Sequence, residues 1–115
     1  MKKILVVDDS PVDLKNIERI VSDAGAMVIT ATSGADALAK AKESAPAMIF
    51  LDVNMPGIDG FSTARQLAAD PATKAIPIVF VTSKDQKADR VFAQMLGAKG
   101  YVTKPYTAAD IVAKL

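Results

Sequence analysis

Five short apolar runs recur along this chain, and a segment of helical pattern follows each of them. Continuous apolar runs of this length are typical of strands buried on both faces, and strands that alternate with helices form a parallel sheet. The pattern predicts strands near 3–8, 27–31, 47–52, 77–81 and 99–102. We therefore expect an α/β fold, a doubly wound sheet of five parallel strands with five helices.

Chain connectivity restricts the order of these strands. Right-handed crossovers, with helices on both faces of the sheet, favour the order 2-1-3-4-5, numbered along the chain. Ligands of such sheets bind where the strand order reverses, beside the first strand and at the carboxyl ends of the strands.

Three helix starts show a serine or threonine followed three residues later by aspartate, which is a capping pattern. The pairs are Ser10 and Asp13, Ser33 and Asp36, and Thr107 and Asp110. Tyr106 and Ile111 are spaced for a hydrophobic staple, and Gly25 suits the end of the first helix. In the fourth helix we predict a core-facing stripe of Ala88, Val91, Phe92, Met95 and Leu96, opposite Lys87, Asp89, Arg90 and Gln94.

Polar side chains stand where the apolar runs end: Asp8 and Asp9, Asp52, Thr82 and Lys104. Since parallel strands end at one edge of the sheet, these residues are expected to share one pocket. Carboxylates packed together repel one another unless a cation lies among them, and an all-oxygen site suits Mg²⁺, which commonly bridges to phosphate. The predicted chemistry is phosphoryl transfer.

Each of these residues also has an ordinary structural interpretation. Paired surface acids are common, and the segment 52–60 could be an ordinary turn. Thr82 and Ser83 could cap the next helix, and Lys104 could be a solvated surface lysine. Only the combination favours a site.

The composition limits the classes of function that remain. Its 115 residues suit one domain, 1–115, and the absence of cysteine and histidine excludes disulfides, thiol nucleophiles and histidine catalysis within the chain. A net charge of +1 gives no case for direct binding to nucleic acid or membrane. No stretch approaches a membrane span, so we expect a soluble cytoplasmic protein.

The two halves of the chain differ in charge. Residues 1–60 carry nine acidic and six basic side chains, whereas residues 61–115 carry four acidic and eight basic ones. This distribution fits either solvated helices or an acidic pocket beside a basic partner surface.

Taken together, these motifs resemble the CheY-like receiver domain of two-component response regulators over essentially the whole chain. The matching residues are Asp8, Asp9, Asp52, Met55-Pro56, Gly60, Thr82-Ser83, Tyr101 and Lys104-Pro105. Single-domain regulators of the chemotaxis and twitching type are the nearest in character.

The resemblance implies a role for each residue. Asp52 would be the phosphoacceptor, a carboxylate nucleophile. Asp9, Asp52 and the Asn54 backbone carbonyl would bind Mg²⁺, with Asp8 acting through a water, and Lys104 would neutralise phosphoryl oxygens. The Lys104–Pro105 peptide would be cis.

The resemblance also implies a switch. The Thr82 hydroxyl would move to the phosphoryl group and Tyr101 would turn inward, changing the surface of helix 4, strand 5 and helix 5. Lys87, Arg90, Gln94 and Lys99, with Tyr101, are the candidates for contact with a partner. Asn54 and Lys84 would tune the lifetime of the phosphoryl group, and we hypothesise that Lys84 slows its loss.

The predicted function is a signalling switch phosphorylated by a separate histidine kinase and acting on a downstream protein, as a monomer or a phosphorylation-dependent dimer. It would catalyse its own modification without being a turnover enzyme. The alternatives are a scaffold that works without phosphate, and an enzyme such as a Mg²⁺-dependent phosphohydrolase or a nucleotide or flavin binder. No G-x-G-x-x-G or G-x-x-x-x-G-K-[ST] motif follows the first strand.

Overall fold

The computed structural model describes residues 2–115 and shows a five-stranded parallel sheet. Its strands are β1 (Lys3–Val7), β2 (Met27–Ala31), β3 (Met48–Leu51), β4 (Ile78–Thr82) and β5 (Gly100–Thr103). They lie in the order β2-β1-β3-β4-β5, with every neighbouring pair parallel. The predicted fold class and strand order are confirmed, and the strand boundaries differ from the expected ones by at most one residue.

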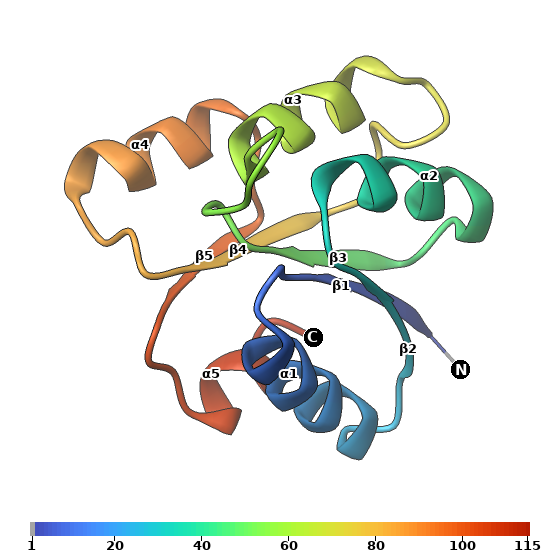
Figure 1. Cartoon of the computed structure of the whole chain (residues 1–115), viewed down its shortest axis with the longest axis vertical. Helices are drawn as coiled ribbons and strands as arrows, with labels where there is room; N and C mark the ends of the chain where they lie inside the picture. Colours follow the sequence, from blue (N-terminus) through green and yellow to red (C-terminus); the bar gives the residue numbers. More distant parts are fainter. Residues whose placement is uncertain (1) are drawn as a thin grey trace.

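Five helices cover the two faces of this sheet (Figure 1). They are α1 (Pro11–Asp23), α2 (Gly34–Ser44), α3 (Gly60–Ala69), α4 (Lys87–Met95) and α5 (Ala108–Val112). Helices α1 and α5 lie on one face and α2, α3 and α4 on the other (Figure 1). None of the helices in residues 2–115 has the length and apolarity needed to cross a membrane.

Alternate side chains of each central strand enter two separate cores. In β1, Leu5 and Val7 join the core beneath α2 and α3, whereas Ile4 and Val6 join the core beneath α1. A strand buried on both faces needs apolar residues at every position, which explains the continuous runs in the sequence. The rigid frame built in this way fixes the positions of the residues that follow each strand.

The capping patterns produce the expected helix starts. The hydroxyls of Ser10, Ser33 and Thr107 accept hydrogen bonds from the amides of Asp13, Asp36 and Asp110, and Asp110 completes a capping box. Gly25 follows the end of α1 with φ +95°, a conformation that favours glycine. Tyr106 and Ile111 belong to the same core, as a staple requires.

The predicted core stripe of α4 is wrong for three of its five residues. Ala88, Val91 and Met95 are exposed, whereas Ala93 is buried and Phe92 and Leu96 are half-buried. Phe92 sets this orientation because its ring packs edge-on against Phe61 of α3, with ring centroids 4.9 Å apart. The helix is therefore rotated about its axis relative to the expectation, and it presents an apolar strip to solvent.

Candidate functional site

The predicted site residues come together at the carboxyl edge of the sheet. Asp8 and Asp9 follow β1, Asp52 follows β3, Thr82 ends β4 and Lys104 follows β5. Backbone hydrogen bonds continue past the strand ends: the Asp52 amide donates to the Val7 carbonyl at 3.0 Å and the Lys104 amide to the Thr82 carbonyl at 2.9 Å. These bonds hold the side chains in place before any ligand binds.

The three acidic side chains form one cluster. Carboxylate oxygens of Asp8, Asp9 and Asp52 all lie within 4.8 Å of one another. Asp8 and Asp52 are buried, whereas Asp9 is exposed. An all-oxygen donor set that is open on one side fits a hard divalent cation retaining several waters. The chemistry of these residues therefore matches the metal site expected from the sequence.

Lys104 bridges this acidic cluster to α1. Its Nζ donates to Asp8 Oδ2 at 2.8 Å, to Asp13 Oδ2 at 3.0 Å and to Asp52 Oδ2 at 3.5 Å. Burial acts to lower the pKa of Lys104, but the hydrogen bonds to Asp8 and Asp13 and the charges of Asp52 and Asp8 outweigh it, so the pKa is raised. The lysine is accordingly a fixed positive charge beside the acids. The Lys104–Pro105 peptide is cis, as the resemblance implies.

The carboxyl group of Asp52 is held in an unfavourable electrostatic environment. Burial and the charge of Asp8 raise its pKa to about 6, although Lys104 and the Asn54 amide act in the opposite direction. The Asn54 amide donates to Asp52 Oδ1 at 3.2 Å. A cation bound among these carboxylates would relieve this repulsion.

The loop from 52 to 60 passes very close to itself. A Cβ on Gly60 would overlap the Asp52 carbonyl oxygen and the Val53 Cα, so only glycine fits there. Asp59 then caps α3, with its Oδ1 accepting from the Ser62 amide at 2.8 Å. Asn54, the predicted backbone ligand, is exposed, and its side-chain amide donates to Ser83 Oγ at 3.3 Å.

The backbone of one residue, Lys84, links the two predicted switch residues. Thr82 is fully buried, and its Oγ1 accepts a hydrogen bond from the Lys84 amide at 3.2 Å. The hydroxyl of half-buried Tyr101 donates to the Lys84 carbonyl at 2.7 Å. A movement of the Thr82 hydroxyl would remove the acceptor of the Lys84 amide, while Tyr101 stays bonded to the carbonyl of the same residue.

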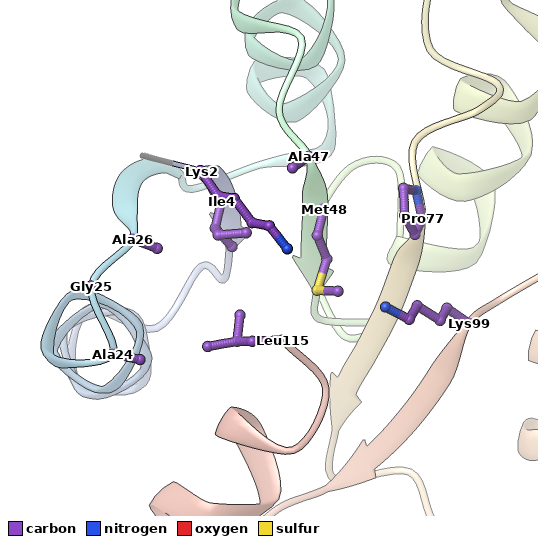
Figure 2. Close-up of a pocket in the computed structure, with 10 residues that line it drawn as sticks. All are labelled: Lys2, Ile4, Ala24, Gly25, Ala26, Ala47, Met48, Pro77, Lys99 and Leu115. Atoms are coloured by element: carbon purple, nitrogen blue, oxygen red, sulfur yellow. The ribbon is translucent and has the colours of Figure 1, made fainter.

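Four of the predicted partner residues, Lys87, Arg90, Gln94 and Lys99, are exposed and Tyr101 is half-buried, and they do not form one group. Lys87, Arg90 and Gln94 lie on α4, and the Arg90 guanidinium stands 5.0 Å from the centroid of the Tyr101 ring. Arg90 and Tyr101 line a hollow of about 300 Å³ between α4, β5 and α5. The Lys99 side chain instead extends toward a cavity at the amino edge of the sheet (Figure 2).

That second cavity has a volume of about 320 Å³ and a different character. Its wall includes the apolar side chains of Ile4, Met48 and Leu115, and Lys2 and Lys99 extend over it (Figure 2). The residues that line it include no carboxylate side chain, hydroxyl or other nucleophile that is ready to react. The cluster of carboxylates with a lysine lies instead at the carboxyl edge.

Sequence reasoning missed Asp13 as a member of the site and recognised it only as a helix-capping acid. Its Oδ2 lies 3.0 Å from Lys104 Nζ, although the two residues are 91 positions apart. No local pattern contains such a contact, because it depends on how α1 meets the segment after β5.

Comparison with known proteins agrees with this geometry. Residues 4–115 match the family described as the response regulator receiver domain. The chain is 41% identical to Protein PilH of Pseudomonas aeruginosa over 91% of this chain and 87% of that protein. It is 34% identical to Protein PilG of the same organism over 96% of this chain and 82% of that protein.

A solved structure gives the same result in three dimensions. The chemotaxis protein CheY4 of Vibrio cholerae superposes with a TM-score of 0.91 at 32% identity, covering 99% of this chain and 94% of that one. The family match spans residues 4–115, a range that contains Asp8, Asp9, Asp52 and Lys104. The chain therefore belongs to the response regulator receiver domain family.

Proposed function

We propose that this chain is a phosphorylation-dependent switch in which Asp52 accepts a phosphoryl group from a separate histidine kinase, with Mg²⁺ as cofactor. One observation supports this most strongly: the Lys104 ammonium lies among the carboxylates of Asp8, Asp13 and Asp52. A buried acid beside a fixed cation and a potential metal site is the arrangement that phosphoryl transfer requires. Because these 115 residues contain no histidine, the donor histidine lies outside them.

The transfer needs little beyond these groups. An Asp52 carboxylate oxygen forms a bond to phosphorus as the nitrogen–phosphorus bond of the donor breaks, and the donor's imidazole nitrogen retains the electron pair. Mg²⁺, held by Asp9, Asp52 and the Asn54 carbonyl with Asp8 acting through a water, would neutralise charge on the phosphoryl oxygens. Lys104 supplies a second positive charge from a position fixed by Asp8. The protein modifies itself once per cycle and is not a turnover enzyme.

The hydrogen bonds around Lys84 support a route from the phosphoryl group to the surface. In the proposed switch the Thr82 hydroxyl turns to a phosphoryl oxygen and gives up the Lys84 amide. The backbone at Lys84 then shifts, which changes the position of Tyr101 because the tyrosine hydroxyl is bonded to the carbonyl of the same residue. The phosphoryl group acts only through its different contacts in the two states.

The surface that receives this change combines charge with exposed apolar groups. Arg90 stacks on Tyr101, and the same helix exposes Val91 and Met95, of which Met95 is 76% exposed. Exposed apolar side chains within a charged rim suit a reversible contact with a protein. We infer that the partner binds the α4–β5–α5 face, and that the protein works in the cytoplasm in control of motility, in chemotaxis or twitching.

The intact mass of the protein after incubation with Mg²⁺ and acetyl phosphate tests this function. We expect one added phosphoryl group per chain, and none without Mg²⁺ or in Asp52→Asn. Asp59→Asn, in an exposed acid of the same loop, is the matched control and should label fully. Absence of labelling in the wild-type protein would favour a scaffold that works without phosphate, and repeated release of phosphate from a specific small substrate would favour an enzyme.

A further inference from the structure

Asp13 reaches the site from α1 and takes up one of the three donors of the Lys104 ammonium. The ammonium donates to Asp8 and Asp13 at 2.8 and 3.0 Å, whereas its third contact, to Asp52, is longer, at 3.5 Å. A lysine ammonium has three hydrogens, so all of them are directed to carboxylates. The weakest of the three contacts is the one to the residue that would carry the phosphoryl group.

The start of α2 shows that this contact is not a necessary part of helix capping. Asp36 has the same place after Ser33 as Asp13 has after Ser10, and in both pairs the serine hydroxyl accepts from the aspartate amide. The Asp36 carboxylate pairs with Lys40 one turn along its own helix, at 3.3 Å. Asp13 instead pairs with a residue in the site, and its side chain is 43% exposed while that of Lys104 is 18% exposed.

We propose that Asp13 is a positioning residue that restrains Lys104 in the resting protein and competes with the phosphoryl group for its ammonium, an inference that rests on the proposed function of Asp52. The restraint acts through Lys104, because Asp13 is not among the acids that cluster as a metal site. On phosphorylation the ammonium turns to a phosphoryl oxygen, and the contact with Asp13 is given up or lengthened. Asp13 thereby slows phosphorylation and favours the resting state.

The kinetic test uses charge removal at position 13 with the matched position in α2 as control. We expect Asp13→Asn to label with acetyl phosphate about two to five times faster than wild type, since a partly exposed ion pair is weak. Asp13→Glu, which keeps the charge, and Asp36→Asn, which removes the equivalent charge from α2, should both label at the wild-type rate. Equal or slower labelling of Asp13→Asn would overturn the proposal.

Two further measurements separate restraint from other effects. In a Lys104→Ala background, Asp13→Asn should no longer change the rate; an acceleration that persists would mean that the Asp13 charge acts directly on the phosphoryl group, contrary to the proposal. The Mg²⁺ dissociation constant of Asp13→Asn should stay within about twofold of wild type, because an exposed charge outside the donor set adds little. A tenfold loss of affinity would make Asp13 a metal ligand instead.

The structural test does not depend on phosphorylation. Crystal structures of wild type and Asp13→Asn without Mg²⁺ or phosphodonor should show Lys104 Nζ moving toward Asp52, from 3.5 Å to an ordinary hydrogen-bond length. An unchanged distance in the variant would overturn the restraint. If no protein labels at all, the proposed function of Asp52 fails, while this distance still decides the role of Asp13.

Discussion

The two ends of β1, β3 and β4 differ in what they bury. At the carboxyl ends, Asp8 and Asp52 are buried beside Lys104, and burial together with the charge of Asp8 raises the pKa of Asp52 to about 6. At the amino ends, Ile4 and Met48 line a cavity with Lys99 extended over it (Figure 2). The same strands thus hold repelling charges at one end and apolar side chains at the other. Buried acids that repel one another lower the stability of the fold, and the buried apolar side chains of the same strands offset that loss.

The largest difference between the ends should appear in the rate of phosphoryl labelling. Lys104→Ala removes the fixed cation at the phosphoryl oxygens, and loss of one such electrostatic contact costs about 10²- to 10³-fold in rate. Lys99→Ala removes a lysine at the opposite end of the sheet and should label at the wild-type rate. Labelling kinetics followed by intact mass check both variants. If the two alanine variants slowed labelling equally, the ends would not differ in function.

For the free energy of unfolding, we expect the larger effect from a substitution at the amino ends of the strands. Met48→Ala deletes a buried side chain at the amino end and should lower the free energy of unfolding by about 3 kcal/mol. Met27→Ala, on the exposed part of edge strand β2, should change it by less than about 1 kcal/mol. Urea unfolding followed by circular dichroism measures both. All of the folded Met48→Ala protein should still accept a phosphoryl group. If folded Met48→Ala failed to label, the two ends of the sheet would not be separate in function.

The cost of the buried acid should depend on pH in the Mg²⁺-free protein. Because the pKa of Asp52 is raised from 3.8 to about 6 on folding, its protonated form stabilises the fold below the unfolded value, and this stability is lost as pH rises through about 6. Asp52→Asn cannot ionise, so it should match wild type at about pH 4 and exceed it by about 2 kcal/mol at about pH 7. Urea unfolding over this range measures the difference. A variant that is less stable than wild type at neutral pH would show that ionised Asp52 is not under strain.

The smallest expected effect concerns the lifetime of the phosphoryl group at the carboxyl end. Lys84→Glu should speed its loss about two- to fivefold, because an exposed cation near the site stabilises the anionic group only weakly. Lys87→Glu makes the same charge change farther along, on α4, and should have no effect on the rate. Decay of the phosphorylated mass after removal of the donor gives both rates. An unchanged or slower loss in Lys84→Glu would disprove the role of Lys84.

The sequence predicted most of the fold because the three central strands, β1, β3 and β4, are buried on both faces. Continuous apolar runs marked the strands, and a polar residue at the end of a run marked its carboxyl end, as Asp52 does for β3. Parallel pairing then brought Asp8, Asp52, Thr82 and Lys104 to one edge without any knowledge of side-chain contacts. The metal-binding, switching and partner roles of the individual residues remain predictions.

Features that depend on contacts between distant elements were not predicted. The rotation of α4 depends on the packing of Phe92 against Phe61, and Ala93, which faces the core, contributes too little hydrophobicity to reveal the buried side. The direction of Lys99 and the contact of Asp13 with Lys104 likewise depend on how separate elements meet. Periodicity reports the faces of one element and carries no information about its neighbours.

The most direct measurement of the central claim is the position of the phosphoryl group in the chain. Borohydride reduces an aspartyl phosphate to homoserine, so peptide mass analysis of the labelled and reduced protein identifies the acceptor. We expect homoserine at residue 52 and at no other aspartate position. Homoserine at position 8, 9 or 13, or an unreduced chain that still carries phosphate, would contradict the assignment of Asp52 as the phosphoacceptor.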